Sequence, residues 1–460
     1  MLASIVNTFT NCFKIPELKS RILFTAALLG ICRLIAYVPV PGLNGEALTA
    51  FFKQQATGGG MLGMYSLFTG GALEHCAVGA LGIMPYISAT IIIQLLTAVI
   101  PRLSKLAREE GGRAKIIQYG RYFTVLLCLI WGTITTMGWE NPEKLFQGWN
   151  LGRLVLYSDD YLWWYRIQTT LILTTGTMLL MWLGEQITER GIGNGVSLVI
   201  TIGIVARLPQ AGTALRDMFL AGPGVEAKYN LGHLIALVLL LVGVVAGVIA
   251  VTQAQRKIPV QYAQRAVGRK VYSGGTSFLP LKVNYAGVMP IIFAQAILMF
   301  PQQIFSRLGS LLDVKFFKEI AVALTEGKLL YLLVYGVMIL FFSYFWVATQ
   351  FNELQIADDL KKNGGYVPGV RPGQATSDYL HNAMSRITLA GAIFLTVIAV
   401  IPIILTTEMN IPYHVSQFFG GTSMLIMVGV MLDTMRQVES HLLMRHYDGF
   451  LKKGRLRGRF

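Results

Sequence analysis

Long apolar segments alternate along the chain with short segments rich in charge, glycine or proline. Crossing the hydrocarbon core of a membrane, roughly 30 Å thick, takes about 20 apolar residues in a helix. Segments near that length lie near 22–39, 77–100, 122–139, 164–184, 194–208, 232–252, 284–304, 329–350, 387–406 and 418–436. The pattern therefore predicts an all-α integral membrane protein with ten transmembrane helices.

Two of these segments are less regular than the others. A glycine-rich stretch, residues 58–71, leads into the second segment, and the short fifth segment opens with GIGNG at 191–195. GIGNG lacks the preceding strand and the remaining spacing of a dinucleotide-binding loop, so a helix start or a bend is the better interpretation. Interrupted helices often lie at the functional site of membrane proteins that are built from repeats.

The loop near 210–230 divides the ten segments into two sets of five. Because five is odd, the second set must enter the membrane from the opposite side, which predicts two inverted halves around a central pathway. The predicted organisation is an N-terminal half at 1–212, a C-terminal half at 213–436 and a basic cytoplasmic tail at 437–460.

Composition supports the membrane class and narrows the chemistry. The chain is 54% hydrophobic and 14% charged, whereas about a quarter of the residues in soluble domains are charged. These values exclude a disordered chain, a collagen-like chain and a large aqueous catalytic domain. The four cysteines lie far apart, with no CxxC and no paired histidine spacing, so neither a metal site nor a redox pair is indicated. No cofactor is predicted.

Basic residues are concentrated on one side of the predicted membrane. Of the 39 Lys and Arg residues, 27 lie in the segments on the same side as the two termini, which predicts that both termini are cytoplasmic. Topology alone requires some of this charge. The loop at 253–282, however, carries six basic residues and no acid, and the last fifteen residues carry five basic residues. We interpret both as surfaces for an anionic partner, either lipid head groups or RNA phosphates.

Familiar catalytic motifs are missing from the sequence. It contains no P-loop, HExxH, GxSxG or EF-hand pattern, so an enzyme is not expected. Arg33 is the one clear charge inside a predicted span, whereas ion-coupled transporters usually carry carboxylates or histidines there. The pattern favours a passive conduit for a bulky, variable substrate. An inverted-repeat secondary transporter of a small solute is the alternative, and a membrane-embedded enzyme is a more distant one.

Five long motifs resemble the SecY family, the pore subunits of protein translocation channels. They are GALGIMPYISATIIIQLL at 79–96, MWLGEQITERGIGNGVSLVI at 181–200, LPLKVNYAGVMPIIFAQ at 279–295, ADDLKKNGGYVPGVRPG at 357–373 and FGGTSMLIMVGVMLD at 419–433. The resemblance implies ten helices in two inverted halves around an hourglass pore that opens sideways toward lipid. The implied function is conduction of unfolded secretory polypeptides, with lateral release of transmembrane segments.

The family's central constriction falls on six aliphatic residues, called the pore ring here. By the resemblance they are Ile83, Ile87, Val196, Ile200, Ile292 and Ile426. Two pairs have a spacing of four, which places each pair on one helix face. Spacing alone fits ordinary helix packing better than a pore, because aliphatic pairs are common in every membrane helix. A narrow aliphatic ring could dewet and give a barrier to leakage that does not depend on the sequence of the substrate.

The resemblance also implies a plug and a lateral gate. The plug corresponds to Met61–Leu73, with Met61, Leu62, Met64, Leu67, Phe68 and Leu73 as candidate residues. A surface or re-entrant loop without a gating role is the alternative. Candidate polar residues of the lateral gate are Ser88, Gln94, Asn284 and Gln295. Simple hydrogen bonding between helices explains these four residues equally well.

Basic residues in two cytoplasmic loops match the family's docking sites. They are Arg256, Lys257, Arg269 and Lys270 in the first loop and Lys361, Lys362 and Arg371 in the second. The implied partners are subunits similar to SecE and SecG, the SecA motor ATPase, the ribosome, signal sequences with their unfolded preproteins, and anionic lipids. The implied location is the bacterial inner membrane.

Overall fold

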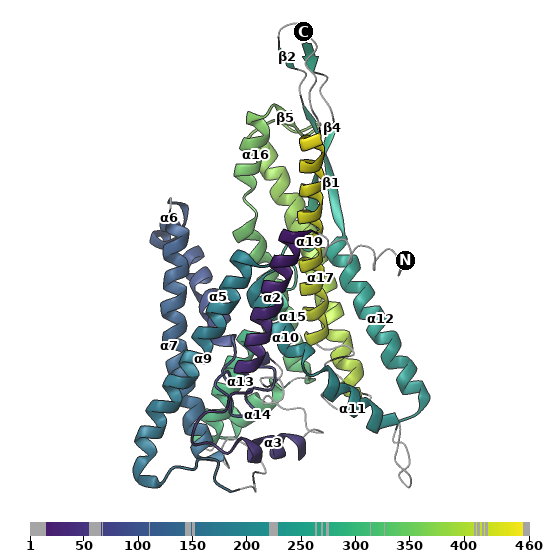
Figure 1. Ribbon diagram of the computed structural model, residues 1–460. Coiled ribbons are helices and arrows are strands. Elements are labelled where there is room, and N and C mark those ends of the chain that lie inside the picture. Colours follow the sequence, from purple (N-terminus) through teal and green to yellow (C-terminus); the bar gives the residue numbers. More distant parts are fainter. Residues whose placement is uncertain are drawn as a thin grey trace. The chain divides into compact units, whose positions relative to one another are not determined.

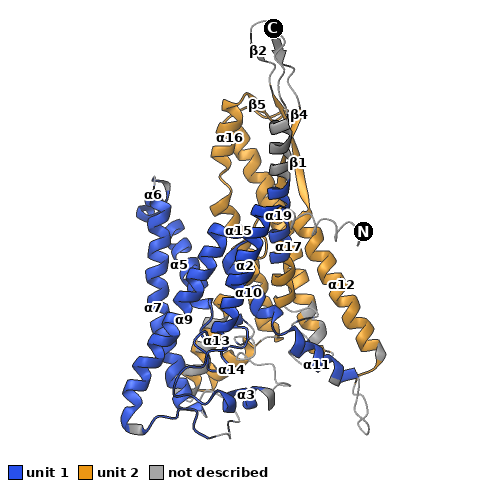
Figure 2. Ribbon diagram, in the orientation of Figure 1, with its two compact units in different colours: residues 1–226, 412–418, 430–460 blue, residues 227–411, 419–429 orange. Residues whose placement is uncertain are grey.

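The structure is a computed structural model of all 460 residues. It describes residues 15–54, 66, 68–109, 111–142, 149, 152–219, 229–262, 265–267, 270–272, 276–312, 314–325, 327–408, 411, 415, 418 and 422–453. The chain divides into two compact units, shown in Figure 2. The first comprises residues 1–226, 412–418 and 430–460, and the second comprises residues 227–411 and 419–429. The predicted boundary at 212 and 213 stays a prediction.

The first unit is helical in its described part (Figure 1). Its elements are α2 (Pro16–Ile35), α3 (Gly45–Gln54), α5 (Met84–Val99), α6 (Pro101–Arg108), α7 (Gly112–Glu140), η1 (Asp159–Tyr161), α9 (Leu162–Arg190), α10 (Gly195–Val205) and α11 (Leu208–Phe219). Residues 430–453 of α19 (Thr422–Lys453) also belong to it. The chain bends by 104° between α5 and α6. Ile100, the residue between the two helices, is extended because the proline that follows it, Pro101, disfavours a helical conformation in the residue before it.

Two arginine–glutamate pairs tie α7 to α9 at opposite ends. Arg121 near the start of α7 donates from Nε and Nη2 to Glu185, at 3.1 and 2.7 Å. Arg166 near the start of α9 donates in the same way to Glu140, at 2.9 and 2.8 Å. Because each pair joins the beginning of one helix to the end of the other, the two helices are antiparallel.

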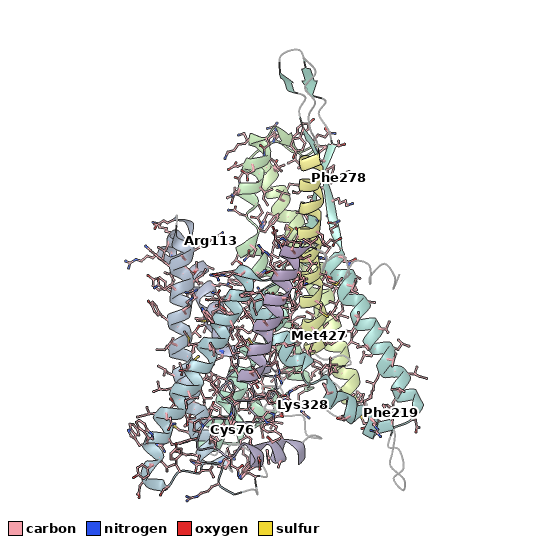
Figure 3. All side chains as sticks on the ribbon, in the orientation of Figure 1. Cys76, Arg113, Phe219, Phe278, Lys328 and Met427 are labelled. Carbon is pink, nitrogen blue, oxygen red and sulfur yellow. The ribbon has the colours of Figure 1, made fainter. Side chains whose placement is uncertain are left out.

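The main apolar core of the first unit joins its loops to the helix ends. Buried members come from the segment between α2 and α3, from α3, from residues 73–81, from α7, from residues 149–155 and from α9. Trp139 and Tyr165 are among its largest fully buried side chains. Leu73 and Cys76 belong to this core, which anchors the chain that leads into α5; Cys76 is labelled in Figure 3.

The second unit combines helices with two small β-sheets. Its helices are α12 (Leu231–Gln253), α13 (Met289–Leu312), α14 (Lys315–Ala323), α15 (Leu329–Gln350), α16 (Glu353–Lys362), α17 (Gln374–Glu408) and the first part of α19. Its strands are β1 (Gln255–Tyr262), β2 (Arg265–Val267), β3 (Lys270–Tyr272), β4 (Thr276–Lys282) and β5 (Gly365–Tyr366). The expectation of an all-α protein is therefore wrong for the basic loop at 253–282, although the chain is mostly helical.

The basic loop is an antiparallel β-hairpin. β1 pairs with β4 from Gln255 opposite Lys282 to Gln261 opposite Thr276, and β5 adds a short third strand beside β1. β2 and β3 pair within the hairpin beyond these strands (Figure 1). Ile258, Leu281 and Val367 are buried with residues of α15 and α17 in one apolar cluster. Ile356 of α16 packs against the same cluster, which fixes the hairpin, α16 and the loop that follows α16 together, called here the hairpin module.

Several helices are apolar enough to cross a membrane. Within the described residues, six have the required length and composition, or seven if α5 and α6 form one bent span. Many large apolar side chains of α7, α9, α12 and α15 are exposed, among them Leu126, Trp182, Leu239 and Phe341. Exposed apolar surface on this scale is typical of helices that face lipid. The count of ten transmembrane helices stays a prediction.

Candidate functional site

Four residues of the predicted pore ring lie in the first unit, at the starts of two helices. Ile83 is the residue before α5, and Ile87 follows one turn later; both side chains are buried. In α10, Ile200 is buried and Val196 is half-buried. α5 and α10 both contain little except aliphatic and small polar residues. Neither helix therefore provides a charged group at these positions.

The other two ring residues lie in the second unit. Ile292 is on α13 and Ile426 is on the first part of α19, and both are buried. Five of the six ring candidates therefore lie on helices, and Ile83 caps the start of α5. That the six side chains surround one pore stays a prediction.

The GIGNG motif is a tightly packed connection between α9 and α10. Asn194 caps α10 by accepting a hydrogen bond from the Ser197 backbone N–H. Gly193 has a φ of +90° and donates its backbone N–H to Gln437 Oε1 at 2.8 Å. A Cβ on Gly195 would overlap the carbonyl oxygen of Gly184 on α9. The motif is therefore the bend and helix start expected from the sequence, and its glycines allow close backbone packing.

Replacing Gly195 with alanine is expected to displace α10 and destabilise the first unit by about 2 to 4 kcal/mol, because the added methyl group meets rigid backbone. The Tm of the purified protein in detergent measures the effect. Gly120→Ala is the matched control, since the helical Gly120 has open space where a Cβ would lie. If the two variants have the same Tm, the close packing of GIGNG does not matter for stability.

The predicted plug is described only in its second half. Met61, Leu62, Met64 and Leu67 lie outside the described residues. Phe68 is buried and, with Ile83, Leu180 and Val199, lines a cavity of about 30 Å³ in the first unit. A candidate plug residue and a candidate ring residue therefore face the same cavity.

Leu73 differs from the rest of the predicted plug. It belongs to the main core of the first unit, and it follows Gly70 and Gly71, whose φ values are +63° and +91°. Backbone of this kind favours glycine, and the conformational freedom of the two glycines predicts a hinge at this point. Leu73 is thus packed as an anchor beyond that hinge.

Two arginines that sequence reasoning did not assign to the plug contact it. Arg33 donates from Nη1 to the carbonyl of Gly70 at 2.8 Å and lies over the ring of Tyr37. Arg207 pairs with Glu74 at 2.7 Å and also donates to Ser66 Oγ at 2.6 Å. Arg33 lies inside the predicted span at 22–39, and Arg207 lies at the end of the predicted span at 194–208. The signal for both was a cation in an apolar segment.

The four lateral-gate candidates have different surroundings. On α5, Ser88 is buried and Gln94 is half-buried. In the second unit, Asn284 donates from Nδ2 to the carbonyl of Gly287 at 2.9 Å, a local turn contact. Gln295 on α13 is buried, and its Oε1 has no hydrogen-bond partner in the described part of the chain. Of the four, Gln295 alone thus combines burial with an unsatisfied polar atom.

The docking candidates that the structure describes are exposed on the second unit. Arg256 and Lys257 lie on β1, and Lys361 and Lys362 are in the last turn of α16. Arg371 lies in the loop between β5 and α17, and its backbone carbonyl accepts a hydrogen bond from Thr376 Oγ1 at 2.8 Å. Arg269 lies outside the described residues, and only the backbone of Lys270 is described, as the start of β3.

The hairpin module holds these cations at separate but fixed places. Its apolar cluster includes Ile258 on β1 and Val367 next to Arg371's loop. Exposed side chains of the same module include Phe278 on β4 (Figure 3). A rigid module with exposed guanidinium and ammonium groups can bind phosphate or carboxylate groups. Among the described residues, no group of three His, Cys, Asp or Glu side chains could hold a metal ion.

Comparison with known proteins gives one consistent result. The SecY family model matches residues 77–435. The chain is 42% identical over 456 residues to the protein translocase subunit SecY of Chlamydia trachomatis, which covers 98% of this chain and 99% of that relative. It is 42% identical over 446 residues to the protein translocase subunit SecY of Escherichia coli, with 96% of each covered.

Solved structures with a similar fold are protein-conducting channels. A structure described as that of a protein conducting channel has a TM-score of 0.56 at 18% identity, with 91% of each chain covered. Sec61 in the canine ribosome-channel complex from the endoplasmic reticulum has a TM-score of 0.54 at 17% identity, again with 91% of each chain covered. At these identities the likeness concerns the fold alone.

Proposed function

The chain belongs to the SecY family of protein translocase subunits, and we propose that it forms the channel through which unfolded secretory polypeptides cross the membrane. It is a multi-pass membrane protein and a channel subunit, not an enzyme. The observation that carries the proposal is the match to translocase subunits over nearly the whole length of both chains. The solute-transporter alternative is not supported, because these relatives and solved structures are translocase and channel subunits.

The pore ring gives the proposed channel its barrier. A ring of Ile83, Ile87, Val196, Ile200, Ile292 and Ile426 would exclude water and ions when it is empty. Aliphatic side chains offer no fixed hydrogen bonds, so the same ring could fit around side chains of any kind. The burial of these residues, complete for all but Val196, supports this assignment.

The proposed plug closes the resting channel from the side opposite the basic loops. Its position next to Ile83 in the cavity that Phe68 lines supports this role. Ser88, Gln94, Asn284 and Gln295 are the proposed polar residues of a lateral gate between the two inverted halves. An apolar signal segment would leave through that gate because each leucine-like residue gains about 0.5 kcal/mol at mid-membrane.

The cytoplasmic partners follow from the basic residues of the hairpin module. We assign the hairpin residues Arg256, Lys257, Arg269 and Lys270 to ribosomal RNA, and Lys361, Lys362 and Arg371 to a motor ATPase similar to SecA. Subunits similar to SecE and SecG would complete the complex. The basic tail at 437–460 would contact anionic lipids of a bacterial inner membrane, with both termini in the cytoplasm.

Reconstitution tests the proposed function directly. Vesicles that contain the chain and its partner subunits, given SecA, ATP and a preprotein with a signal sequence, are expected to protect the preprotein from added protease. Vesicles without the chain are the control. A preparation that accumulates a small solute against a gradient and never protects a polypeptide would reverse the assignment.

A further inference from the structure

A buried ion pair in the first unit lies beside the predicted plug. Arg207, between α10 and α11, places Nη2 2.7 Å from Glu74 Oε1, and their side chains are only 5% and 10% exposed. Ser66 completes the group: its Oγ accepts from Arg207 Nη2 at 2.6 Å and donates to Glu74 Oε1 at 2.8 Å. Three polar groups therefore form a closed triangle, called here the Ser66 latch.

The members of the latch are anchored differently. Glu74 directly follows the core residue Leu73, and Arg207 is fixed at the junction of two helices. Ser66 lies on the other side of the hinge at Gly70 and Gly71, within the predicted plug. The ion pair thus belongs to the frame of the unit, while Ser66 is the group that the plug presents to it.

A second arginine contacts the glycine pair that separates Ser66 from Glu74. Arg33 on α2 donates to the carbonyl of Gly70 at 2.8 Å. A Cβ on Gly70 would lie 2.6 Å from Arg33 Nη1 and 2.8 Å from Gly203 Cα. The hinge therefore needs glycine both for its backbone conformation and for the close approach of the cation.

The hydrogen bonding of Arg207 in the latch is incomplete. In the described part of the chain, Arg207 Nε and Nη1 are buried and have no hydrogen-bond partner. Such a pair gains little net free energy, because the cost of desolvation offsets the attraction between the charges. Water that enters on opening would hydrate both nitrogens and lower the cost of releasing Ser66. These properties suit a contact that opens and closes.

We propose that the Ser66 latch sets the threshold at which the plug leaves the closed channel. Glu74 and Arg207 act as positioning residues, and Ser66 is the contact that breaks. The inference rests on the proposed function, because only a channel has a plug to release. A signal segment must then supply the free energy that breaks the latch, so a weaker latch lowers the demand on the signal.

Two variants separate the parts of the latch. Ser66→Ala removes the hydroxyl of the plug and leaves the ion pair whole, so no buried charge loses its partner. Glu74→Gln leaves Arg207 without its counter-ion. Glu140→Gln is the matched control, because the buried Glu140 also pairs with an arginine of this unit, the partly exposed Arg166. The double variant Ser66→Ala/Glu74→Gln measures the coupling between the two positions.

The experiment uses the full complex in planar bilayers and in vesicles. The readouts are the ion conductance without substrate and the protease protection of a preprotein whose signal is interrupted by a charged residue. Ser66→Ala is expected to raise the resting conductance about tenfold, because the hydroxyl's hydrogen bonds to Arg207 and Glu74 are both lost. Glu74→Gln should raise it about tenfold or more, and both should admit the defective preprotein. Adding Ser66→Ala to Glu74→Gln should raise the resting conductance by a smaller factor than Ser66→Ala raises it in the wild-type channel.

The outcomes distinguish the latch from the function on which it rests. Suppose that the wild-type complex protects normal preprotein. If Ser66→Ala and Glu74→Gln then have the wild-type conductance and still reject the preprotein with the defective signal, the latch is refuted. An equal leak in Glu140→Gln would also refute it, since the effect would then come from general loosening. If the wild-type complex protects no preprotein, the proposed function fails instead. Should Glu74→Gln not fold, Ser66→Ala decides alone.

Discussion

Replacing Ile87 and Ile292 together with glycine is expected to raise the ion conductance of the resting channel about tenfold or more, because the barrier depends on a narrow, dewetted constriction. Both side chains are buried, so their removal leaves space that water can enter. The measurement is the conductance of the purified complex in planar bilayers without substrate. Preprotein should still pass, since a wider ring does not obstruct a polypeptide.

A matched pair of substitutions controls for the backbone effect of glycine. Leu96 on α5 and Ile304 on α13 are 37% and 55% exposed, and glycine at these positions weakens the same two helices by about 1 kcal/mol each. Leu96→Gly with Ile304→Gly should leave the conductance at the wild-type value. If the ring variant also has wild-type conductance, Ile87 and Ile292 are not part of the barrier.

Reversing the charge of Lys361, Lys362 and Arg371 is expected to weaken binding of the motor ATPase about a hundredfold at low salt, because three exposed cations of one module become anions. Motor-driven protection of preprotein should fall in parallel. Binding is measured by titration at several salt concentrations. Loss of electrostatic contacts should also make the dependence of affinity on salt less steep.

Lys315→Glu, Lys318→Glu and Lys328→Glu together are the control for net charge, because they also reverse three charges. All three lysines are exposed on the second unit. They lie in the first turn of α14 and just before α15, in segments that the charge distribution assigns to the opposite side of the membrane. Their reversal should leave motor affinity unchanged. Equal weakening by the two sets would mean that overall charge, and not the hairpin module, attracts the motor.

The apolar pattern was sufficient to predict the long helices of the protein. α7, α9, α12, α15 and α17 each overlap a predicted segment, because a long apolar run in a membrane has few alternatives to a helix. GIGNG could likewise be assigned to a bend and a helix start, since Asn194 is a favourable cap and glycine permits close packing.

The β-hairpin could not be predicted from local sequence. Pro259 and Pro280 both lie inside its strands, and proline usually argues against a strand. Alternating burial is confined to two short pairs, Ile258 with Val260 on β1 and Leu279 with Leu281 on β4. Ile258 packs in one cluster with residues more than a hundred positions later, such as Val367. The stabilising contacts are therefore invisible in the loop itself.

Only the local features of the candidate site could be predicted from the sequence, because its other contacts join distant parts of the chain. Spacing could place Ile83 with Ile87 on one helix face, but the pore ring depended on resemblance. Glu74 and Arg207 are separated by 133 positions, and no local rule connects a carboxylate after a glycine pair to an arginine at a helix end. Only the fold brings them together with Ser66.

Cross-linking from an arrested nascent chain tests the central claim most directly. A photoreactive residue is placed at positions 83, 87, 200, 292 and 426 in turn, with exposed positions 171 and 239 as controls. A preprotein stalled during transport is predicted to cross-link at each of the five probed positions of the pore ring and at neither control position. Cross-links confined to the control positions, or none at the ring positions while transport proceeds, would contradict a pore lined by these aliphatic residues.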